Sequence, residues 1–331
     1  MVENAGTCQH PYENLSPETI MDGLDAIGFH CSGHLLALNS YENRVYQLGQ
    51  DEGPPVIAKF YRPGRWSNEA IREEHVFTTA LADAEVPVVA PIAIEGKTLF
   101  EYKGFRIAVY PRRGGRAPDL GMEEHLEWLG RFIGRIHLLG GMYTFEHRPD
   151  LNPQTFGYDA REIVLQSGFV PDYLRQNYES VSADLLREID ARYESVGPVR
   201  KIRLHGDCHP GNMLWTDDGP HFVDFDDARN GPAVQDLWML LSGERDDMTR
   251  QLEVVLKGYH DFADFDFAEL HLIESLRSLR MLHYAAWISS RWGDPAFPMA
   301  FPWFDSPRYW EEHIQTLREQ LYALDLPVLQ I

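Results

Sequence analysis

Residues 204–215 read LHGDCHPGNMLW and form the densest polar cluster in the chain. A β-type run at 221–223 follows and ends in the acidic sequence DFDD, which starts at Asp224. Glycine and proline residues bend the chain between Asp207 and Asn212. Because the run at 221–223 can return the chain beside this bend, we expect Asp207, Asn212 and Asp224 to lie close together.

This set of side chains suits phosphoryl transfer. That reaction needs a carboxylate that orients or deprotonates the attacking hydroxyl, oxygen ligands for Mg²⁺ and a cation on the nucleotide phosphates. Asp207 and Asn212 have the D-x-x-x-x-N spacing of a kinase catalytic loop, and Asp224-Phe225 matches the start of D-F-G. Aspartate and asparagine oxygens are also the ligands that a hard cation prefers. The segment therefore indicates a phosphotransferase with a magnesium site.

The N-terminal part of the chain predicts a small lobe built on an antiparallel sheet. Ile20, Leu24 and Ile27 fall at helical spacing and indicate a short helix before the sheet. Ser67-Asn68 can cap a second, main helix that runs to about Ala82. Turn clusters separate several β-type runs from one another. Those runs lie at 35–39, 44–48, 56–61, 91–95, 98–101 and 105–110.

The sequence PRRGGRAPD at 111–119 marks a change from strands to helices. We therefore predict an N-terminal lobe at 1–110, a linker at 111–119 and a C-terminal lobe at 120–331. A β-type insert at 202–226 carries the polar segment inside the second lobe. A small sheet lobe followed by a larger, mostly helical lobe is an α+β, two-lobe fold. Helical patterns in the second lobe lie at 122–139, 180–195, 233–243, 247–263, 267–292 and 308–322.

The composition restricts the partners of the protein. The chain has 331 residues and a formal net charge of −21. Nucleic acid and anionic lipid both require clustered lysine and arginine, so neither is an expected partner. No apolar run reaches the ~18–20 residues of a membrane span, no signal-peptide pattern is visible, and the three cysteines are too scattered for a disulfide framework. We expect a cytoplasmic protein that acts as a monomer.

The segment at 205–212 matches completely the H-G-D-x-H-x-x-N loop of the kinases that share the aminoglycoside phosphotransferase and choline kinase fold. Within that superfamily the chain resembles the bacterial stress response kinases, which are serine/threonine protein kinases. The resemblance covers nearly the whole chain. It implies a two-lobe, protein-kinase-like fold, ATP and Mg²⁺ as cofactors, and transfer of the γ-phosphoryl group to serine or threonine hydroxyls of a protein. The supporting segments are 38–47, 59–63, 204–215, 222–241 and 294–298.

The resemblance also implies a role for each matching residue of the polar segment. Asp207 looks like the catalytic base. Asn212 and Asp224 look like the Mg²⁺ ligands, which places Asp224 in both the catalytic and the metal site. Asp236 matches a structural aspartate that steadies the catalytic loop.

A second group of residues is implied to hold the nucleotide. Lys59, in the third predicted strand, resembles the lysine that anchors the phosphates. Ser40 lies in the turn between the first two strands, where the resemblance implies nucleotide contact. The linker residues at 110–112 resemble the hinge whose backbone groups meet the adenine.

The resemblance places a glutamate partner for Lys59 on the helix at 68–82. Two glutamates of that helix are candidates. We favour Glu74 because it shares a face with the apolar residues of the helix and so points inward. Glu73 is the alternative.

Three features differ from ordinary protein kinases. The glycine-rich G-x-G-x-x-G loop is absent, and the side chains of Ser40 and Asn43 are predicted to share its work on the phosphates. Gly206 replaces the arginine of H-R-D, and D-F-G reads D-F-D with no A-P-E segment after it. We therefore expect no activation-loop control of the usual kind. Asp226 and Asp227 are consistent with a second metal site or with solvation of their loop.

Three other functions stay open at this point. A small-molecule kinase of the same superfamily would phosphorylate an amino alcohol, a sugar or an aminoglycoside, and an acidic cleft would favour cationic acceptors. A pseudokinase would bind nucleotide and serve as an interaction module, although the intact set of Lys59, Asp207, Asn212 and Asp224 speaks against it. A metallohydrolase could use the H-x-D-x-H string at 205–209, but that site needs further ligands.

Overall fold

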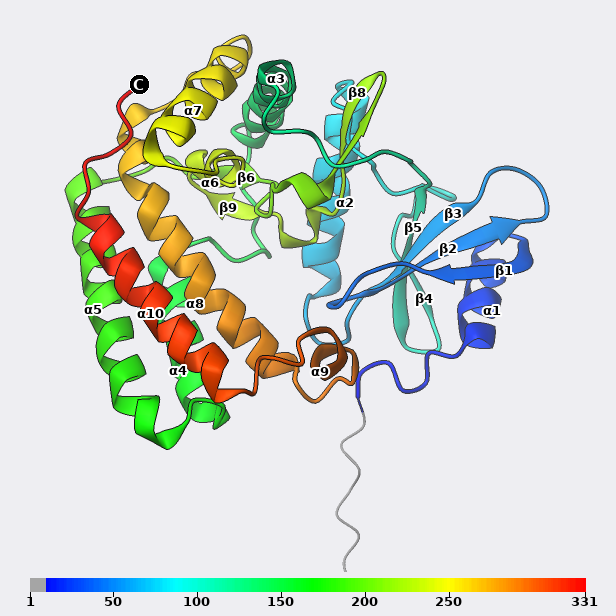
Figure 1. The fold of residues 1–331 in the computed structure, drawn as a ribbon. Helices are drawn as coiled ribbons and strands as arrows, with labels where there is room; N and C mark the ends of the chain where they lie inside the picture. Colours follow the sequence, from blue (N-terminus) through cyan, green and yellow to red (C-terminus); the bar gives the residue numbers. More distant parts are fainter. Residues whose placement is uncertain (1–9) are drawn as a thin grey trace, which may run out of the picture.

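The computed structural model describes residues 10–331, which fold into two lobes (Figure 1). The smaller lobe is a five-stranded antiparallel sheet with the strand order β1-β2-β3-β5-β4 and two helices. This arrangement confirms the predicted α+β, two-lobe plan; residues 1–9 of the predicted first lobe lie outside the described residues. The elements of the smaller lobe are α1 (Pro17–Ile27), β1 (Cys31–Ala37), β2 (Arg44–Gln50), β3 (Val56–Phe60), α2 (Asn68–Asp83), β4 (Phe100–Tyr102) and β5 (Phe105–Pro111).

Local sequence explains where the two helices of this lobe begin. Ser16 accepts a hydrogen bond from Thr19 N at 3.2 Å and caps α1. Ser67 accepts one from Ala70 N at 3.1 Å, so the predicted start of α2 is confirmed. A capping hydroxyl satisfies one of the backbone N–H groups that the first helical turn leaves without a partner. The sheet packs against α1 through a buried cluster that includes Leu24.

One predicted strand is wrong and another is displaced. Residues 91–95 form no strand: Ile92 N donates a single hydrogen bond to Val109 O, and an isolated bridge joins Ile94 and Lys97. Pro91 has no N–H to give to a ladder, which limits pairing here. The predicted run at 98–101 appears two residues later, as the short strand β4.

The larger lobe is mostly helical, as predicted. The helix α5 begins eight residues before the predicted pattern at 180, and α6 is shorter than the pattern at 233–243. The helix at 159–167 follows a residue without a side-chain cap, and the helix at 296–300 contains a proline, so neither carries a clear signal. The helices are α3 (Glu123–Gly140), α4 (Asp159–Ser167), α5 (Asp172–Val196), α6 (Val234–Trp238), α7 (Arg245–Tyr259), α8 (Ile273–Arg291), α9 (Ala296–Ala300) and α10 (Pro307–Leu324).

Two short β-ladders lie inside this lobe and carry the polar segment. The strands are β6 (Ile202–Leu204), β7 (Met213–Thr216), β8 (Gly219–Phe222) and β9 (Arg229–Gly231); β6 pairs with β9, and β7 pairs with β8. Backbone hydrogen bonds tie this insert to the smaller lobe and its linker. Val89 N donates to Phe222 O at 3.0 Å, and Trp215 N donates to Arg116 O at 2.6 Å. The polar segment is thereby fixed at the junction of the lobes.

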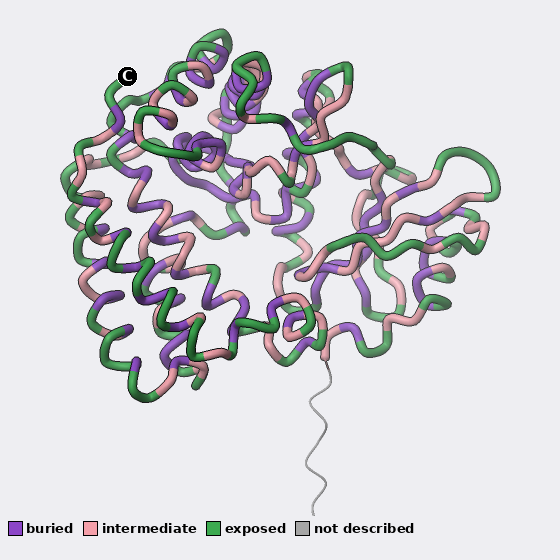
Figure 2. The backbone as a smooth tube through the Cα atoms, in the orientation of Figure 1, coloured by how far each residue is buried: buried purple, intermediate pink, exposed green. Residues whose placement is uncertain are grey.

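The helices α3 and α7 pack backbone against backbone. A Cβ atom at Gly130 would lie 2.0 Å from Val255 O, and one at Gly258 would lie 2.1 Å from Glu127 O. Glycine is therefore required on both helices at this crossing. Buried and exposed residues alternate along α5 and α10 (Figure 2), because one face of each helix packs against the core and the other faces solvent.

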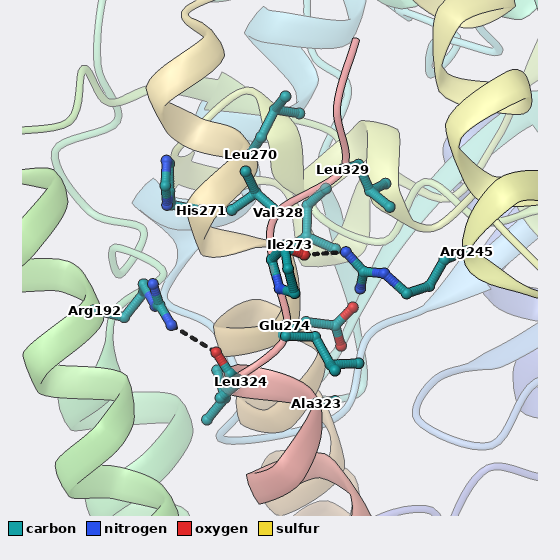
Figure 3. Close-up of a pocket in the computed structure, with 12 residues that line it drawn as sticks. Arg192, Arg245, Leu270, His271, Ile273, Glu274, Ala323, Leu324, Val328 and Leu329 are labelled. Carbon is teal, nitrogen blue, oxygen red and sulfur yellow. Dashed lines mark hydrogen bonds between the residues drawn. The ribbon is translucent and has the colours of Figure 1, made fainter.

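The C-terminal segment after α10 folds back onto the larger lobe. Arg192 donates to Leu324 O at 2.6 Å, and Arg245 donates to Pro327 O (Figure 3). The cavity beside this segment is about 20 Å³, which is room for about one water molecule, and none of its lining residues comes from the polar segment. No helix between residues 10 and 331 is long and apolar enough to cross a membrane.

Candidate active site

The loop after β6 contains the predicted catalytic residues. Gly206 has a φ of +84°, and a Cβ atom at this position would lie 2.2 Å from Asp227 O. Only glycine fits both the left-handed backbone and the close approach. The chain at 227 thus occupies the space that a side chain at 206 would need, which explains in physical terms why no arginine precedes Asp207.

The carboxylate of Asp236 binds the backbone of this loop. It is fully buried and accepts hydrogen bonds from His205 N at 2.8 Å and Gly206 N at 2.9 Å. His137 Nε2 lies 3.1 Å from the same carboxylate. These hydrogen bonds hold the loop at 205–206 in place, as predicted for Asp236.

Replacement of Asp236 by asparagine should lower the free energy of unfolding by about 1–3 kcal/mol, because the new amide NH₂ faces a buried backbone N–H that then lacks an acceptor. Urea unfolding at pH 7 measures the loss. The exposed Asp217→Asn change in the neighbouring turn serves as the control and should leave stability unchanged. Equal stability of the two variants would contradict the role of Asp236.

Asp207 lies among hydrogen-bond donors and cations. Arg280 Nη1 donates to Asp207 Oδ1 at 2.6 Å, and His209 Nε2 lies 3.4 Å from Oδ2. Asn212 Nδ2 donates to Asp207 O at 3.0 Å. Burial by itself would raise the pKa of Asp207, but His209 and Arg280 outweigh burial and lower the pKa to about 2. Asp207 is therefore an ionised carboxylate at neutral pH.

Asn212 and Asp224 are brought to the same place, as expected from the sequence. Val223 N donates to Asn212 O at 3.0 Å, so the residue before Asp224 is tied to Asn212. Asp224 adopts a left-handed backbone with φ of 59°, and just over half of its side chain (54%) is exposed. The amide nitrogen of Asn212 donates to Asp207, which leaves its Oδ1 free of that contact.

These oxygens fit a magnesium ion. Mg²⁺ is usually held by one or two carboxylates together with substrate phosphates rather than by an all-protein cage. Within residues 10–331, no group of three or more histidine, cysteine, aspartate or glutamate side chains is arranged to hold a metal alone. Asp224 and Asn212 would hold the ion, which when bound draws negative charge from the phosphate oxygens.

Lys59 lies on β3 beside these residues and is almost fully buried. Its Nζ lies 3.0 Å from Asp224 Oδ1 and 3.2 Å from Asp226 Oδ1. Burial disfavours the ammonium ion, but the two carboxylates outweigh burial and hold the pKa of Lys59 well above its usual range. Lys59 is therefore a buried cation that faces Asp224, the predicted magnesium ligand.

The predicted partner of Lys59 pairs with another cation in this structure, and its pairing with Lys59 stays a prediction. Glu74 is buried and points inward as expected, but its carboxylate forms an ion pair with Arg148 at 3.0 Å and not with Lys59. The alternative, Glu73, accepts hydrogen bonds from two backbone N–H groups at 146 and 147. The carboxylate of Asp226, in the loop after β8, forms an ion pair with Lys59 instead.

Asp226 and Asp227 both take part in ion pairs, and a second metal at these residues stays untested. Asp226 is buried and contacts Lys59, Arg65 and the side-chain amide of Asn43, which donates at 3.0 Å. Asp227 accepts from Arg65 and Arg229, each at 2.7 Å.

Two other predictions concern the turn before β2. The side chain of Asn43 is buried and bonded to Asp226 and to Arg62 N, so its predicted contact with phosphate is wrong. Ser40 is half-buried in this turn, and its hydroxyl donates to Asn43 O at 3.2 Å. Its contact with nucleotide stays a prediction.

The metallohydrolase reading of the H-x-D-x-H string does not fit the structure. His205 is fully buried, its Nε2 donates to Val223 O at 2.9 Å, and its Nδ1 accepts from Asp207 N at 3.3 Å. Both ring nitrogens therefore have protein partners, and His205 cannot join His209 as a metal ligand.

Several arginines complete the site, and sequence reasoning missed them. Arg148 donates to Asp226 O and Ala228 O at 2.8 Å, in addition to its pair with Glu74. Arg280 contacts Asp207 from α8, which is 73 residues further along the chain. Arg148 lies in the segment between α3 and residue 154, and Arg280 lies on α8. Arginines usually face solvent, so nothing local in the sequence marks these two.

Known proteins resemble this chain along its whole length. A family model described as the phosphotransferase enzyme family matches residues 34–273. Stress response kinase A of Escherichia coli strain K12 is 43% identical over 320 residues, which cover 97% of each chain. A Salmonella typhimurium protein described as serine/threonine protein kinase RdoA is 42% identical over 331 residues, or 100% of this chain and 99% of that protein. These similarities confirm the resemblance to the stress response kinases.

Solved structures show the same fold. An amicoumacin kinase in complex with AMP-PNP, Ca²⁺ and its ligand has a TM-score of 0.74 at 18% identity, covering 95% of each chain. A microcompartment-associated aminopropanol kinase has a TM-score of 0.70 at 19% identity, covering 93% of this chain and 99% of that one. The predicted protein-kinase-like architecture is thereby confirmed.

Proposed function

The chain belongs to the phosphotransferase enzyme family, and we propose that it transfers the γ-phosphoryl group of ATP to serine or threonine hydroxyls of proteins with Mg²⁺ as cofactor. One observation carries this proposal. Residues from three distant parts of the chain meet between the lobes: the buried cation Lys59, the catalytic loop with Asp207 and Asn212, and Asp224. This is the set that phosphoryl transfer requires. The kinase names of the full-length relatives support the same reaction.

Each residue has a distinct task in this proposal. Lys59 binds phosphate oxygens of ATP, and Asn212 and Asp224 hold Mg²⁺. Asp207 accepts a hydrogen bond from the acceptor hydroxyl. This bond directs the hydroxyl oxygen toward the γ-phosphorus of ATP. A carboxylate with a pKa of about 2 is a weak base, so Asp207 orients the hydroxyl first and takes its proton late in the transfer.

The biological setting follows from the relatives. Several of them are named stress response kinases, and we propose that this protein also works in a bacterial stress response. We further propose that it acts in the cytoplasm as a monomer, with a protein substrate as its partner.

A small-molecule kinase is the second candidate function. It is favoured by the fold likeness to an aminopropanol kinase and an amicoumacin kinase. A pseudokinase is less well supported, because the cation, the carboxylate and the oxygen ligands are all present and assembled.

Transfer from γ-labelled ATP with Mg²⁺ separates these candidates. The acceptors would be generic proteins in one set of reactions and amino alcohols, sugars and aminoglycosides in another. Label on protein serine or threonine would support the proposal. Label on a small molecule alone would establish the second candidate, and tight ATP binding without transfer would indicate a pseudokinase.

Replacement of Lys59 by alanine should weaken ATP binding by about tenfold or more, because a charge-assisted contact to phosphate contributes roughly 1.5–3 kcal/mol. Calorimetric titration with ATP and Mg²⁺ measures the affinity. The exposed Lys97→Ala change in the same lobe removes an equal charge and serves as the control. Equal affinities of both variants would show that Lys59 does not hold the phosphates.

A further inference from the structure

Arg280 contacts the catalytic carboxylate from α8, and the function proposed above gives it no task. Its Nη1 donates to Asp207 Oδ1 at 2.6 Å, and 41% of its side chain is exposed. Among residues 10–331 the guanidinium makes no other hydrogen bond. Nη1 of the guanidinium is therefore bound to Asp207, while Nε and Nη2 are available to a ligand that enters the site.

We propose that Arg280 selects acceptors that carry a negative charge next to the reacting hydroxyl, and that it disfavours cationic acceptors. This inference rests on the proposed function and specifies its substrate class: proteins with an aspartate or glutamate close to the serine or threonine. The acceptor hydroxyl must come within hydrogen-bond distance of Asp207 and so within reach of Arg280. The planar guanidinium is well suited to hold a carboxylate in that position.

The charges around Asp207 support this selection. A cationic acceptor would need an unpaired carboxylate, and the nearby Asp227 is already paired with Arg65 and Arg229. His209 adds a second donor to Asp207. An ammonium group placed here would meet Arg280 directly, and like charges in contact oppose binding.

Further along α8, two side chains contact the turn at 39–43 and pair with its carboxylate. Glu42 in that turn is bonded to Arg291 at 3.1 Å and to the indole nitrogen of Trp287. Tyr284, one turn after Arg280, is 39% exposed on the same helix. The Glu42 carboxylate and the Trp287 indole N–H therefore already have hydrogen-bond partners. Despite the net charge of −21 of the whole chain, this part of the site offers no free carboxylate among the described residues to an amino alcohol.

The test compares two serine peptides that differ only in their flanking residues, acidic in one and basic in the other, together with ethanolamine. The wild type should phosphorylate the acidic peptide with a kcat/KM about tenfold or more above that of the basic peptide, and ethanolamine poorly. Arg280→Ala should remove most of this preference, mainly through a higher KM for the acidic peptide. Arg280→Lys should retain part of it, and Arg280→Glu should reverse it.

Peptide affinity in the presence of a non-hydrolysable ATP analogue gives a second readout that does not require transfer. The acidic peptide should bind more tightly to the wild type than to Arg280→Ala, while the affinity for the analogue stays equal. The control is Arg308→Ala, because Arg308 is 86% exposed on α10 and, within residues 10–331, pairs only with Glu312. That variant should keep the charge preference.

Three outcomes would overturn the inference. Equal transfer to both peptides by the wild type would leave the protein kinase function intact and remove the charge selection. A loss in Arg280→Ala that is equal for both peptides and accompanied by weaker binding of the analogue would assign Arg280 to the ATP phosphate. Tighter binding of the basic peptide, together with phosphoryl transfer to ethanolamine and to neither peptide, would refute two claims. These are the selection of acidic acceptors by Arg280 and the proposed protein acceptor.

Discussion

The Asp207→Asn variant should transfer phosphate about 10²–10⁴-fold more slowly than the wild type, because general-base and orienting groups contribute roughly that factor. The amide keeps the shape of the side chain and can still accept the hydrogen bond from Arg280, so the loop should stay in place. It has no negative charge and cannot take the proton of the hydroxyl. The loss should therefore fall on kcat.

Single-turnover transfer from γ-labelled ATP measures this effect directly. ATP affinity should change less than about twofold, since in the proposed function Asp207 contacts the acceptor hydroxyl rather than the nucleotide. The control is Asp218→Asn, a change of the same kind at an exposed turn between β7 and β8. Retention of more than a tenth of the wild-type rate by Asp207→Asn would remove Asp207 from the catalytic role.

The sequence predicted this part of the site well because the constraints there are local. Asp207 and Asn212 are five residues apart on a bent loop, and a strand of four residues returns the chain to Asp224. Turn chemistry and spacing alone determine most of that geometry. The structural role of Asp236 was recognised from a motif, and two backbone hydrogen bonds now account for it.

The ion pairs could not be predicted in the same way. Lys59 and Asp224 are separated by 165 residues, and Glu74 and Arg148 by 74. Helical periodicity correctly placed Glu74 on the inner face, but it contains no information about which cation lies opposite. That choice depends on the path of the chain after β8, where Asp226 enters the space beside Lys59. Long-range pairing of buried charges is a property of the tertiary fold.

Asp226 is the centre of this buried network. It joins Lys59 and Arg65 by charge and Asn43 by a hydrogen bond, while its backbone oxygen accepts from Arg148. Burial would raise its pKa, but Arg65 and Lys59 outweigh burial and lower the pKa to about 2. The folded-state pKa lies below the ordinary value near 3.8, so the ionised form stabilises the fold above about pH 4. That contribution is lost as the pH falls toward 2.

Asp226→Asn should therefore lower the free energy of unfolding at pH 7 by about 3–5 kcal/mol, which is the usual cost of removing one partner from a buried ion pair. Two cations, Lys59 and Arg65, would be left without the carboxylate between them. Urea unfolding measures the stability. The exposed Asp305→Asn change on the surface of the larger lobe provides the reference for an unpaired aspartate.

The same variant also tests which carboxylate positions Lys59 for the phosphates. With Mg²⁺ bound, Asp224 is a metal ligand in the proposed function, and Asp226 is then the remaining carboxylate within 4 Å of Lys59 Nζ. Asp226→Asn should weaken ATP binding more than Glu74→Gln, because Glu74 pairs with Arg148 instead. Both variants replace one buried carboxyl group by an amide of the same size, so they are matched in shape. A greater loss of ATP affinity in Glu74→Gln would return the anchoring role to the helix glutamate and show that the pairing in the free enzyme changes when nucleotide binds.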